Sequence, residues 1–387
     1  MKIVHVITRL IVGGAQENTV LTCRGLFAAG HDVTLAAGVE TGPEGSLWAA
    51  AEASGCRLVR LQAMARSVNP VQDVRAVGEL QRLLTELRPD VVHTHSSKAG
   101  IIGREAAHRS GVPVVVHTIH GMAFNRTQGM LARGLYTILE RRAGEQTTAF
   151  VTVADSMTRQ AVAAGLGPVE RFTTIRSGME TERFGPNASQ RREMRERWGL
   201  DGGEVVVGTI ARLFDNKGYD ELIEAMPGAL RREPRLRFVW VGDGSRRGQF
   251  ERRLVALGLR DRVTMLGLVR PDRVGAIING FDMVLHASRW EGLPRALVQG
   301  LLCEVPAISF DNDGAPEVVI PDETGILVRY GDVAGLADAM VRLAGDARLR
   351  QRLGRRGRAL CLSEFDWRTM VCRLDELYTR VIEARRA

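Results

Sequence analysis

Residues 286–300 read HASRWEGLPRALVQG, and this stretch joins the end of an apolar run to a polar loop and a helical pattern. The apolar run 283–285 predicts a buried strand. Pro294 is expected at the first helical position, where a proline loses no hydrogen bond. The first turn of that helix would direct N–H groups and a partial positive charge at the loop, which suits an anion. Glu291 lies beside this anion site, so we expect it to bind a second, hydroxyl-rich part of the ligand. The alternative is an ordinary strand, loop and helix with an exposed glutamate.

The composition indicates a soluble two-domain protein. A chain of 387 residues exceeds what one core usually serves, and 45% apolar and 25% charged residues are ordinary values. No apolar run approaches the roughly 18–20 residues of a spanning helix, and the first residues suggest a strand instead of a signal peptide. The five cysteines form no C-x-x-C pair, so we expect buried free thiols in a reducing cytoplasm.

The charge disfavours a nucleic-acid partner. The net charge of +8 is spread along the chain, and aromatic residues make up only 5%. Nucleic-acid binders concentrate basic and aromatic residues in patches. Attraction to phosphorylated ligands or anionic lipid headgroups is the better inference, and the expected location is the cytoplasm, either free or at the membrane surface.

Strand-like runs alternate with helical patterns, which predicts parallel sheets built from βαβ units. One series occupies an N-terminal domain, residues 1–180, and a second occupies a C-terminal domain, residues 181–365. The polar, basic segment 181–197 is expected to be the linker. An amphipathic helix over 366–387 closes the chain. The strands are expected at 2–7, 32–37, 58–61, 91–93, 114–118, 149–153 and 173–175, then at 205–210, 237–241, 263–266, 283–286, 307–310 and 326–328.

Two loops of the second series are candidates for phosphate binding. Arg212 and Lys217 follow the strand 205–210, and two fixed positive charges at this spacing suit a diphosphate. Lys217 is one of only three lysines among 53 basic residues. Gly242 and Gly244 follow the next strand and permit a close backbone approach to a ligand, although a plain turn is an equal alternative.

The first series offers a glycine pair and several histidines. Gly13 and Gly14 open a helix after the first strand, without the dinucleotide-binding spacing G-x-G-x-x-G. His120 lies at the C-terminal end of a very apolar strand, where ligands of parallel sheets bind. His95 and Lys98 follow another strand and are candidates for contact with an acceptor. The spacing of His93 and His95 is one that metal ligands use, but no third ligand is evident, so we predict no metal.

Asp311-Asn-Asp313 is similar to the D-x-D motif of metal-dependent sugar transferases. Here it follows a strand late in the second series, whereas that motif normally occurs in the middle of a single-domain fold. We therefore interpret it as a turn.

Taken together, these motifs resemble those of the retaining glycosyltransferases of family 4. Within that family they are most similar to the motifs of bacterial enzymes that synthesise capsule, exopolysaccharide or lipopolysaccharide. The resemblance extends over nearly the whole chain, from Gly13-Gly14 through His120-Gly121, Arg212 and Lys217-Gly218 to Glu291-Gly-Leu-Pro. It implies the GT-B fold, in which two Rossmann-like domains face each other across a cleft. It also implies a metal-independent transfer of a hexose from a nucleotide-diphosphate sugar, with UDP-sugar favoured over GDP-sugar, to a saccharide or polyprenyl-linked acceptor.

The resemblance also implies roles for individual residues. Arg212 and Lys217 would hold the diphosphate and stabilise it as it leaves, and Glu291 would bind hydroxyls of the donor sugar. His120 would contact that sugar, and Gly14 would line the diphosphate. The remaining residues expected at the donor are Gly13, Gly242, Gly244, Gly292, Leu293, Pro294 and Gln299.

Gln299 departs from the family pattern, which would place a second glutamate there to bind the nucleotide ribose. A glutamine oxygen still accepts hydrogen bonds, but more weakly because it is uncharged.

Two alternatives to an active transferase remain. One is a catalytically weak nucleotide-sugar-binding partner subunit, and the other is a sugar-nucleotide epimerase, for which the sequence offers no convincing pair of acid/base carboxylates.

Overall fold

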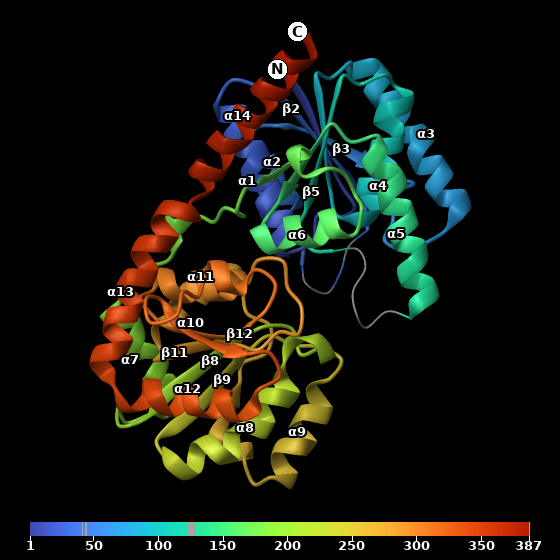
Figure 1. Cartoon of the computed structure of the whole chain (residues 1–387). Helices are drawn as coiled ribbons and strands as arrows, with labels where there is room; N and C mark the ends of the chain where they lie inside the picture. The colour runs from blue at the N-terminus through green and yellow to red at the C-terminus, as the bar shows by residue number, and fades with distance from the viewer. Residues whose placement is uncertain (41, 43–44, 123–128, 387) are drawn as a thin grey trace. The chain divides into compact units, whose positions relative to one another are not determined.

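In a computed structural model that describes residues 1–40, 42, 45–122 and 129–386, the chain folds into two units, each built around a parallel sheet (Figure 1). The first unit consists of Met1–Met179 and Trp367–Ala387, and the second of Glu180–Asp366. Residue 387, the last of the expected final helix, lies outside the described residues. The alternation of strands and helices predicted from the sequence is confirmed, and the strand ends shift by only one or two residues.

The first unit contains a seven-stranded sheet in the order β3-β2-β1-β4-β5-β6-β7. Every neighbouring pair is parallel. The strands are β1 Lys2–Ile7, β2 Asp32–Gly38, β3 Arg57–Leu61, β4 Val91–His95, β5 Val114–Ile119, β6 Ala149–Thr152 and β7 Phe172–Thr174. The helices are α1 Gly14–Ala28, α2 Trp48–Glu52, α3 Pro70–Leu87, α4 Ser97–Arg109, α5 Met130–Glu145, α6 Asp155–Ala163 and α14 Trp367–Arg386.

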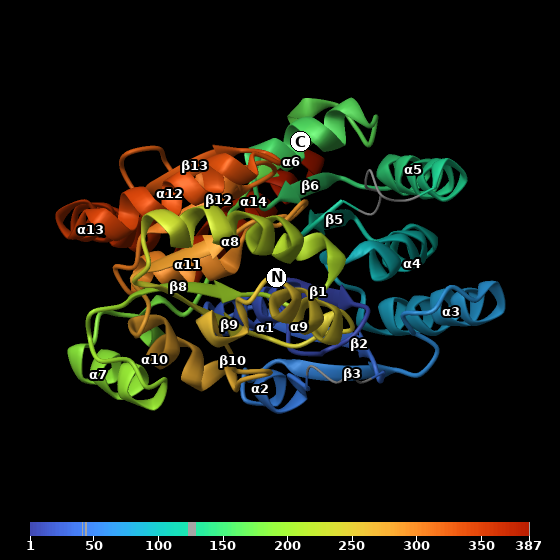
Figure 2. The same ribbon diagram turned by 90° about the horizontal axis from the view of Figure 1, so that it is seen from below.

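Both faces of this sheet are buried, as a parallel sheet requires. Side chains alternate along β1, so Ile3 and Ile7 pack in a core with α1 and α14. Val4 and Val6 pack in the opposite core with α3 and α4. Figure 2 shows α3, α4 and α5 in a row on that second side.

The last helix, α14, belongs to the first unit although it follows the whole second unit in sequence. It packs along α1 (Figure 1). Its apolar face contributes five buried side chains, Met370, Val371, Leu374, Leu377 and Tyr378. Cys372 points outward from the same helix, whereas the other four free cysteines are buried.

The second unit contains a six-stranded parallel sheet in the order β10-β9-β8-β11-β12-β13. The strands are β8 Val205–Ile210, β9 Leu236–Val241, β10 Val263–Met265, β11 Met283–His286, β12 Ala307–Asp311 and β13 Gly325–Arg329. The helices are α7 Ala188–Arg197, α8 Tyr219–Arg232, α9 Arg247–Ala256, α10 Val274–Asn279, α11 Arg295–Leu302, α12 Val333–Gly345 and α13 Ala347–Glu364.

The expected linker 181–197 is largely the helix α7. Asn187 caps its first turn by accepting hydrogen bonds from the N–H groups of Ser189 and Gln190, at 3.1 and 3.0 Å. Arg191 and Arg195 form ion pairs with the Asp282 carboxylate, at 2.6 and 2.9 Å. The basic residues that suggested a solvated linker therefore anchor a helix to the second unit.

The strand order reverses once in each sheet, between β1 and β4 and between β8 and β11. Connections diverge at such a point, so the loops after the two central strands leave a space beyond their carboxyl ends, where ligands of open α/β sheets bind. The loops after β8 and β11 carry Lys217 and Glu291, and those after β1 and β4 carry Gly13 and Ser96.

Candidate functional site

In the second unit, the loop after β8 packs tightly on the end of β11. Gly218 has a φ of 72°, and a Cβ atom on it would overlap the carbonyl oxygen of Ala287. Only glycine tolerates both conditions. The N–H of Arg289 donates to the carbonyl oxygen of Asn216 at 2.9 Å, which joins the two loops a second time. Lys217 therefore lies on a loop whose position is fixed by the neighbouring strand.

Glu291 and Lys217 form an ion pair between these loops. The same carboxylate oxygen, Oε2, also lies 3.3 Å from His286 Nε2 and 3.3 Å from the hydroxyl of Ser288, which donates to it. The Glu291 side chain is 28% exposed, so its second oxygen, Oε1, can accept hydrogen bonds from a ligand. Sequence reasoning expected Lys217 and Glu291 in one site and missed His286 and Ser288.

The electrostatics keep Glu291 ionised. Burial alone would raise the pKa of its carboxyl group, but the charge of Lys217 and the hydrogen bond to His286 outweigh that effect. The result is a pKa of about 2, below the ordinary value of 4.5. The carboxylate is therefore a permanent hydrogen-bond acceptor at neutral pH.

Asp313 supports Glu291 through the backbone. Its Oδ2 accepts the N–H of Glu291 at 2.8 Å, and its own φ of 46° is unusual for a residue other than glycine. Asn312 donates to the carbonyl oxygens of Ser288 and Arg289, both at 3.0 Å. The sequence Asp311-Asn-Asp313 thus forms a turn, and two of its side chains hold the Glu291 loop.

The helix α11 begins at Arg295, so the expectation that Pro294 is its first residue is wrong by one position. Pro294 is the N-cap, with a ψ of 87° that is not helical. Gly292, Leu293 and Pro294 are buried beside the loop, and Gln299 is half-buried on α11. The N-terminal turn of α11 begins at Arg295, four positions after Glu291.

The remaining donor candidates of the second unit lie on adjacent loops. Arg212 is exposed, with its guanidinium 4.8 Å from the centre of the Phe214 ring. Gly242 has a φ of 128°, and a Cβ on it would overlap the carbonyl oxygen of Ala211. Gly244 approaches Leu213 in the same way. These two glycines allow the β8 and β9 loops to pack together, a role that the sequence could not separate from ligand approach.

In the first unit, Gly13 and Gly14 begin α1 at the strand reversal. Gly13 is the N-cap, and its φ of 178° is extended backbone that any residue adopts. A Cβ there would meet only the flexible side chain of Gln16. The backbone conformation therefore does not demand glycine at position 13.

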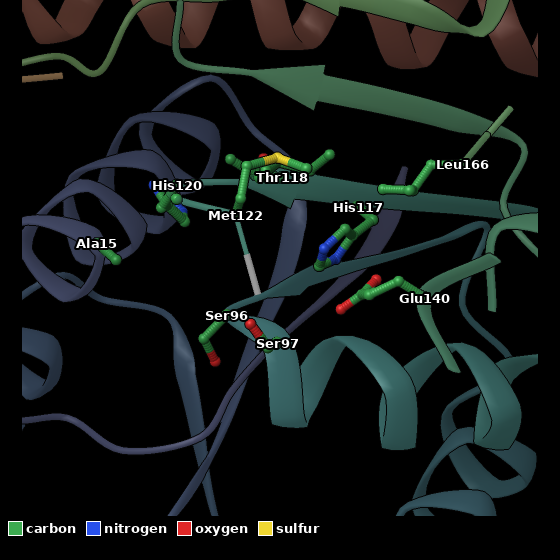
Figure 3. Close-up of a pocket in the computed structure, with 11 residues that line it drawn as sticks. Ala15, Ser96, Ser97, His117, Thr118, His120, Met122, Glu140 and Leu166 are labelled. Carbon is green, nitrogen blue, oxygen red and sulfur yellow. The ribbon is translucent and has the colours of Figure 1, made fainter. Parts of the chain in front are cut away.

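His120 lines a cavity of about 240 Å³ (Figure 3). The cavity combines polar and apolar side chains from α1, α4, β5 and α5 and from the loops after β4, β5 and α6. Its lining includes Ser96, Ser97, His117, Glu140, Met122 and Leu166. Glu140 is held by a buried ion pair with Arg104 at 2.6 Å. His117 Nδ1 forms a hydrogen bond with the Thr94 hydroxyl at 2.8 Å.

A chain of buried histidines runs from His120 into the core. His95 Nδ1 lies 3.1 Å from His120 Nε2, and His95 Nε2 lies 2.9 Å from His5 Nδ1. His93 forms separate hydrogen bonds, with the Tyr378 hydroxyl and with the Thr118 hydroxyl. Sequence reasoning missed His5 and Tyr378, because they are far from β4 along the chain.

His5, His93 and His95 are the group among the described residues whose ligand atoms lie close enough to hold a metal ion, all within 4.8 Å. The hydrogen bonds argue against that use. Both nitrogens of His93 have partners, and the direct contact between His5 and His95 occupies one nitrogen of each ring. We therefore interpret the three residues as a hydrogen-bond network.

The two residues expected at an acceptor have other partners. His95 is 1% exposed and is hydrogen-bonded on both sides, so it reaches a ligand only through His120. Lys98 lies in the first turn of α4, where it pairs with Asp73 at 2.6 Å and donates to the carbonyl oxygen of Ser67.

Two family models match the chain. Residues 13–178 match a model described as a glycosyl transferase 4-like domain. Residues 190–360 match one described as glycosyl transferases group 1. The two matches fall on the two structural units in turn.

Individual proteins match over most of their length. A GDP-mannose-dependent alpha-(1-6)-phosphatidylinositol monomannoside mannosyltransferase of Mycolicibacterium smegmatis is 30% identical over 86% of this chain and 87% of its own. The UDP-Gal:alpha-D-GlcNAc-diphosphoundecaprenol alpha-1,3-galactosyltransferase of Escherichia coli is 29% identical over 73% of each chain. Among solved structures, Anabaena HepE in complex with UDP-glucose superposes with a TM-score of 0.83 at 21% identity, over 98% of this chain and 100% of that one.

We predict that Glu291 stabilises the fold in a pH-dependent way. A carboxyl group whose pKa is lowered on folding stabilises the native state above its unfolded value, and that contribution is lost as the pH falls toward the folded value. The difference in Tm between the wild type and Glu291→Gln should therefore be constant above about pH 6 and shrink below about pH 4.5. Thermal melts between pH 7 and 3.5 measure it.

Asp322→Asn is the control, because its ion pair with Arg342 is largely exposed and surface pairs contribute little. A difference between wild type and Glu291→Gln that stays constant down to pH 3.5 would contradict the assignment of a lowered pKa to Glu291.

Proposed function

Because the chain belongs to the family 4 glycosyltransferases, we propose that it is a retaining, metal-independent hexosyltransferase that uses a nucleotide-diphosphate sugar and a lipid-linked saccharide acceptor. The family makes it a glycosyltransferase with a nucleotide-sugar donor. The stereochemistry, the independence of metal and the acceptor are our proposal. The product belongs to a cell-surface polysaccharide or a glycolipid.

The observation that carries the proposal is the ion pair between Lys217 and Glu291, on two loops that are hydrogen-bonded to their surroundings. Transfer breaks the bond between the anomeric carbon and a phosphate oxygen, so negative charge accumulates on the departing diphosphate. Lys217 and Arg212 provide fixed positive charge for it, together with the N-terminal turn of α11. Glu291, held ionised, accepts hydrogen bonds from the hydroxyls of the donor sugar. His120 contacts the same sugar, as the family resemblance suggests.

The identity of the donor nucleotide is a further part of the proposal. The names of the relatives include both UDP-galactose and GDP-mannose, and HepE binds UDP-glucose. We propose a UDP-sugar. Gln299, on α11, takes the place of the ribose-binding glutamate of the family pattern and makes an uncharged hydrogen bond there.

The first experiment is a thermal-shift screen against UDP, GDP, ADP and TDP, each with and without EDTA. A ligand that binds the native state raises the Tm as its concentration exceeds its Kd. We expect a shift from UDP that EDTA does not change. A shift that requires a divalent ion would overturn metal independence, and a shift from GDP alone would overturn the choice of donor. A UDP shift without sugar transfer in a radiolabelled assay would favour the alternative, a nucleotide-sugar-binding partner subunit.

We predict that Lys217→Ala lowers kcat by roughly 10²–10³-fold, the usual loss when one electrostatic contact to the transition state is removed. Initial rates with a labelled donor measure the change. Arg232→Ala, which removes an exposed ion pair of the same unit, should retain wild-type kcat. A folded Lys217→Ala enzyme with near-normal turnover would remove Lys217 from the mechanism.

A lipid-linked acceptor requires access to a membrane surface, and α5 supports such access. None of the helices in the described part of the chain is both long and apolar enough to span a bilayer. However, Leu131, Leu135 and Ile138 on α5 are all exposed. On the same helix, exposed Arg133 lies between Leu131 and Leu135 in sequence, and exposed Arg142 lies four positions after Ile138. Apolar residues beside arginines suit an interface of anionic lipid headgroups. We propose that α5 contacts the membrane.

We predict that the double variant Leu135→Glu/Ile138→Glu loses binding to phosphatidylglycerol-containing vesicles in a sedimentation assay. The new carboxylates are repelled by anionic headgroups, and the two apolar contacts are lost. The matched control is Val255→Glu/Leu257→Glu in the second unit, where both side chains are also exposed. Equal binding by both double variants and the wild type would exclude α5 as the membrane contact.

A further inference from the structure

His95, which is hydrogen-bonded to His120, and His5, which is hydrogen-bonded to His95, lie in the core of the first unit, on the face of the sheet covered by α1 and α14. β1 contributes His5, and β4 contributes His95. The rings of His5 and His95 stack at an angle of 16° with centres 5.2 Å apart. The Nε2 of His120 then meets His95 Nδ1 at 3.1 Å. Three imidazoles thus form one continuous chain that starts in the core and ends at the cavity.

The backbone around His95 leaves its ring little freedom. Ser96, the next residue, has a φ of 64°, a conformation that costs energy in a residue other than glycine and persists where its surroundings impose it. The hydroxyl of Thr8 lies 2.7 Å from that of Ser96 and accepts the N–H of Ala99 at 3.2 Å. The end of β4 is therefore clamped to the end of β1.

The two inner histidines are neutral at physiological pH. Burial lowers the pKa of His5 to about 3. Burial, and then the neighbouring histidines, lower the pKa of His95 well below 6.5. Each neutral imidazole carries its proton on one nitrogen, so one nitrogen donates and the other accepts.

When His120 is neutral as well, the geometry couples the tautomers of the three rings. If His95 carries its proton on Nδ1, it donates to His120 Nε2, and His95 Nε2 accepts from His5 Nδ1. All three rings then carry the proton on Nδ1. If His95 carries its proton on Nε2, both hydrogen bonds reverse, and all three rings carry the proton on Nε2. Any mixed arrangement places two protons or two lone pairs against each other.

We propose that His95, backed by His5, is the positioning residue of His120, and that it fixes both the orientation of the His120 ring and the nitrogen that carries its proton. The other ring nitrogen of His120, Nδ1, then has one constant hydrogen-bonding sense toward a sugar hydroxyl. The catalytic half of this inference rests on the proposed function, in which His120 contacts the donor sugar. The tautomer half rests on the hydrogen bonds that link His5, His95 and His120.

Replacing His95 by asparagine or glutamine can preserve one of its two hydrogen bonds while removing the other. Asparagine places a polar group where Nδ1 of a histidine lies, and glutamine reaches the position of Nε2. His95→Asn therefore keeps a partner for His120 and loses the contact with His5. His95→Gln keeps the contact with His5 and loses the one with His120. His93→Gln is the matched control, because His93 is equally buried and stacks on His95 with centres 4.3 Å apart but has no hydrogen bond to His120.

The test combines two readouts on the full chain. Long-range ¹H–¹⁵N spectra of histidine-labelled protein identify the protonated nitrogen of each ring. We expect His5, His95 and His120 to share one tautomer in the wild type, and His120 to become a mixture in His95→Gln but not in His93→Gln. We expect kcat to fall roughly 3- to 10-fold in His95→Gln, the loss of one neutral hydrogen bond, and less in His95→Asn and His93→Gln. The midpoint for binding of free UDP should not change.

Different protonated nitrogens among the three wild-type rings would overturn the coupling. Equal kcat losses in His95→Gln, His95→Asn and His93→Gln would reduce His95 to a packing residue. A wild-type protein that transfers no sugar would instead refute the proposed function and with it the catalytic half of the inference, while the spectra would still decide whether His95 sets the tautomer of His120.

Discussion

The reversal of strand order at the middle of each parallel sheet determines where polar chemistry can be placed. A parallel strand must be followed by a crossover, and at the reversal the crossovers leave in opposite directions. The carboxyl ends of β8 and β11 are therefore uncovered by their own helices, although their flanks are buried. Lys217 and Glu291, which lie 74 positions apart in sequence, come into contact there. The ends of β1 and β4 bring Thr8 and Ser96 together in the same way.

The two units offset the free-energy cost of burying polar groups in different ways. A charge removed from water must be paired and hydrogen-bonded, or it is strongly destabilising. The second unit keeps charge: Glu291 is ionised because Lys217 is beside it, and Asp313 holds its backbone. The first unit avoids charge along its histidine chain, where burial keeps His5 and His95 neutral. An ionised carboxylate is a strong hydrogen-bond acceptor, whereas a neutral imidazole offers one donor and one acceptor.

The sequence was sufficient for features that depend on nearby residues. Apolar runs and their spacing predicted the strands of both sheets, and the strand ends placed Lys217, Glu291 and His120 at loops beyond carboxyl ends. Features that depend on register were not predictable. Asp313 could be identified only as part of a turn, because its partner, the N–H of Glu291, lies across the β11–β12 pair. The segment 181–197 was interpreted as a linker for the same reason: nothing local reveals that Asp282 neutralises Arg191 and Arg195.

The hydrogen bond between Tyr378 and His93 joins residues that are 285 positions apart. The polar core of the first unit therefore depends on contacts between distant parts of the sequence. α14 buries five side chains against the first sheet, so without it the face of β1 and β4 that carries the histidines would be open to water. Water would then supply alternative partners for His5 and His95 and raise the local dielectric, and both effects would allow these rings to protonate. The neutral chain that ends at His120 therefore requires the last helix of the polypeptide. The first unit, although it begins the chain, cannot complete its polar core until the second unit has been synthesised and α14 has docked.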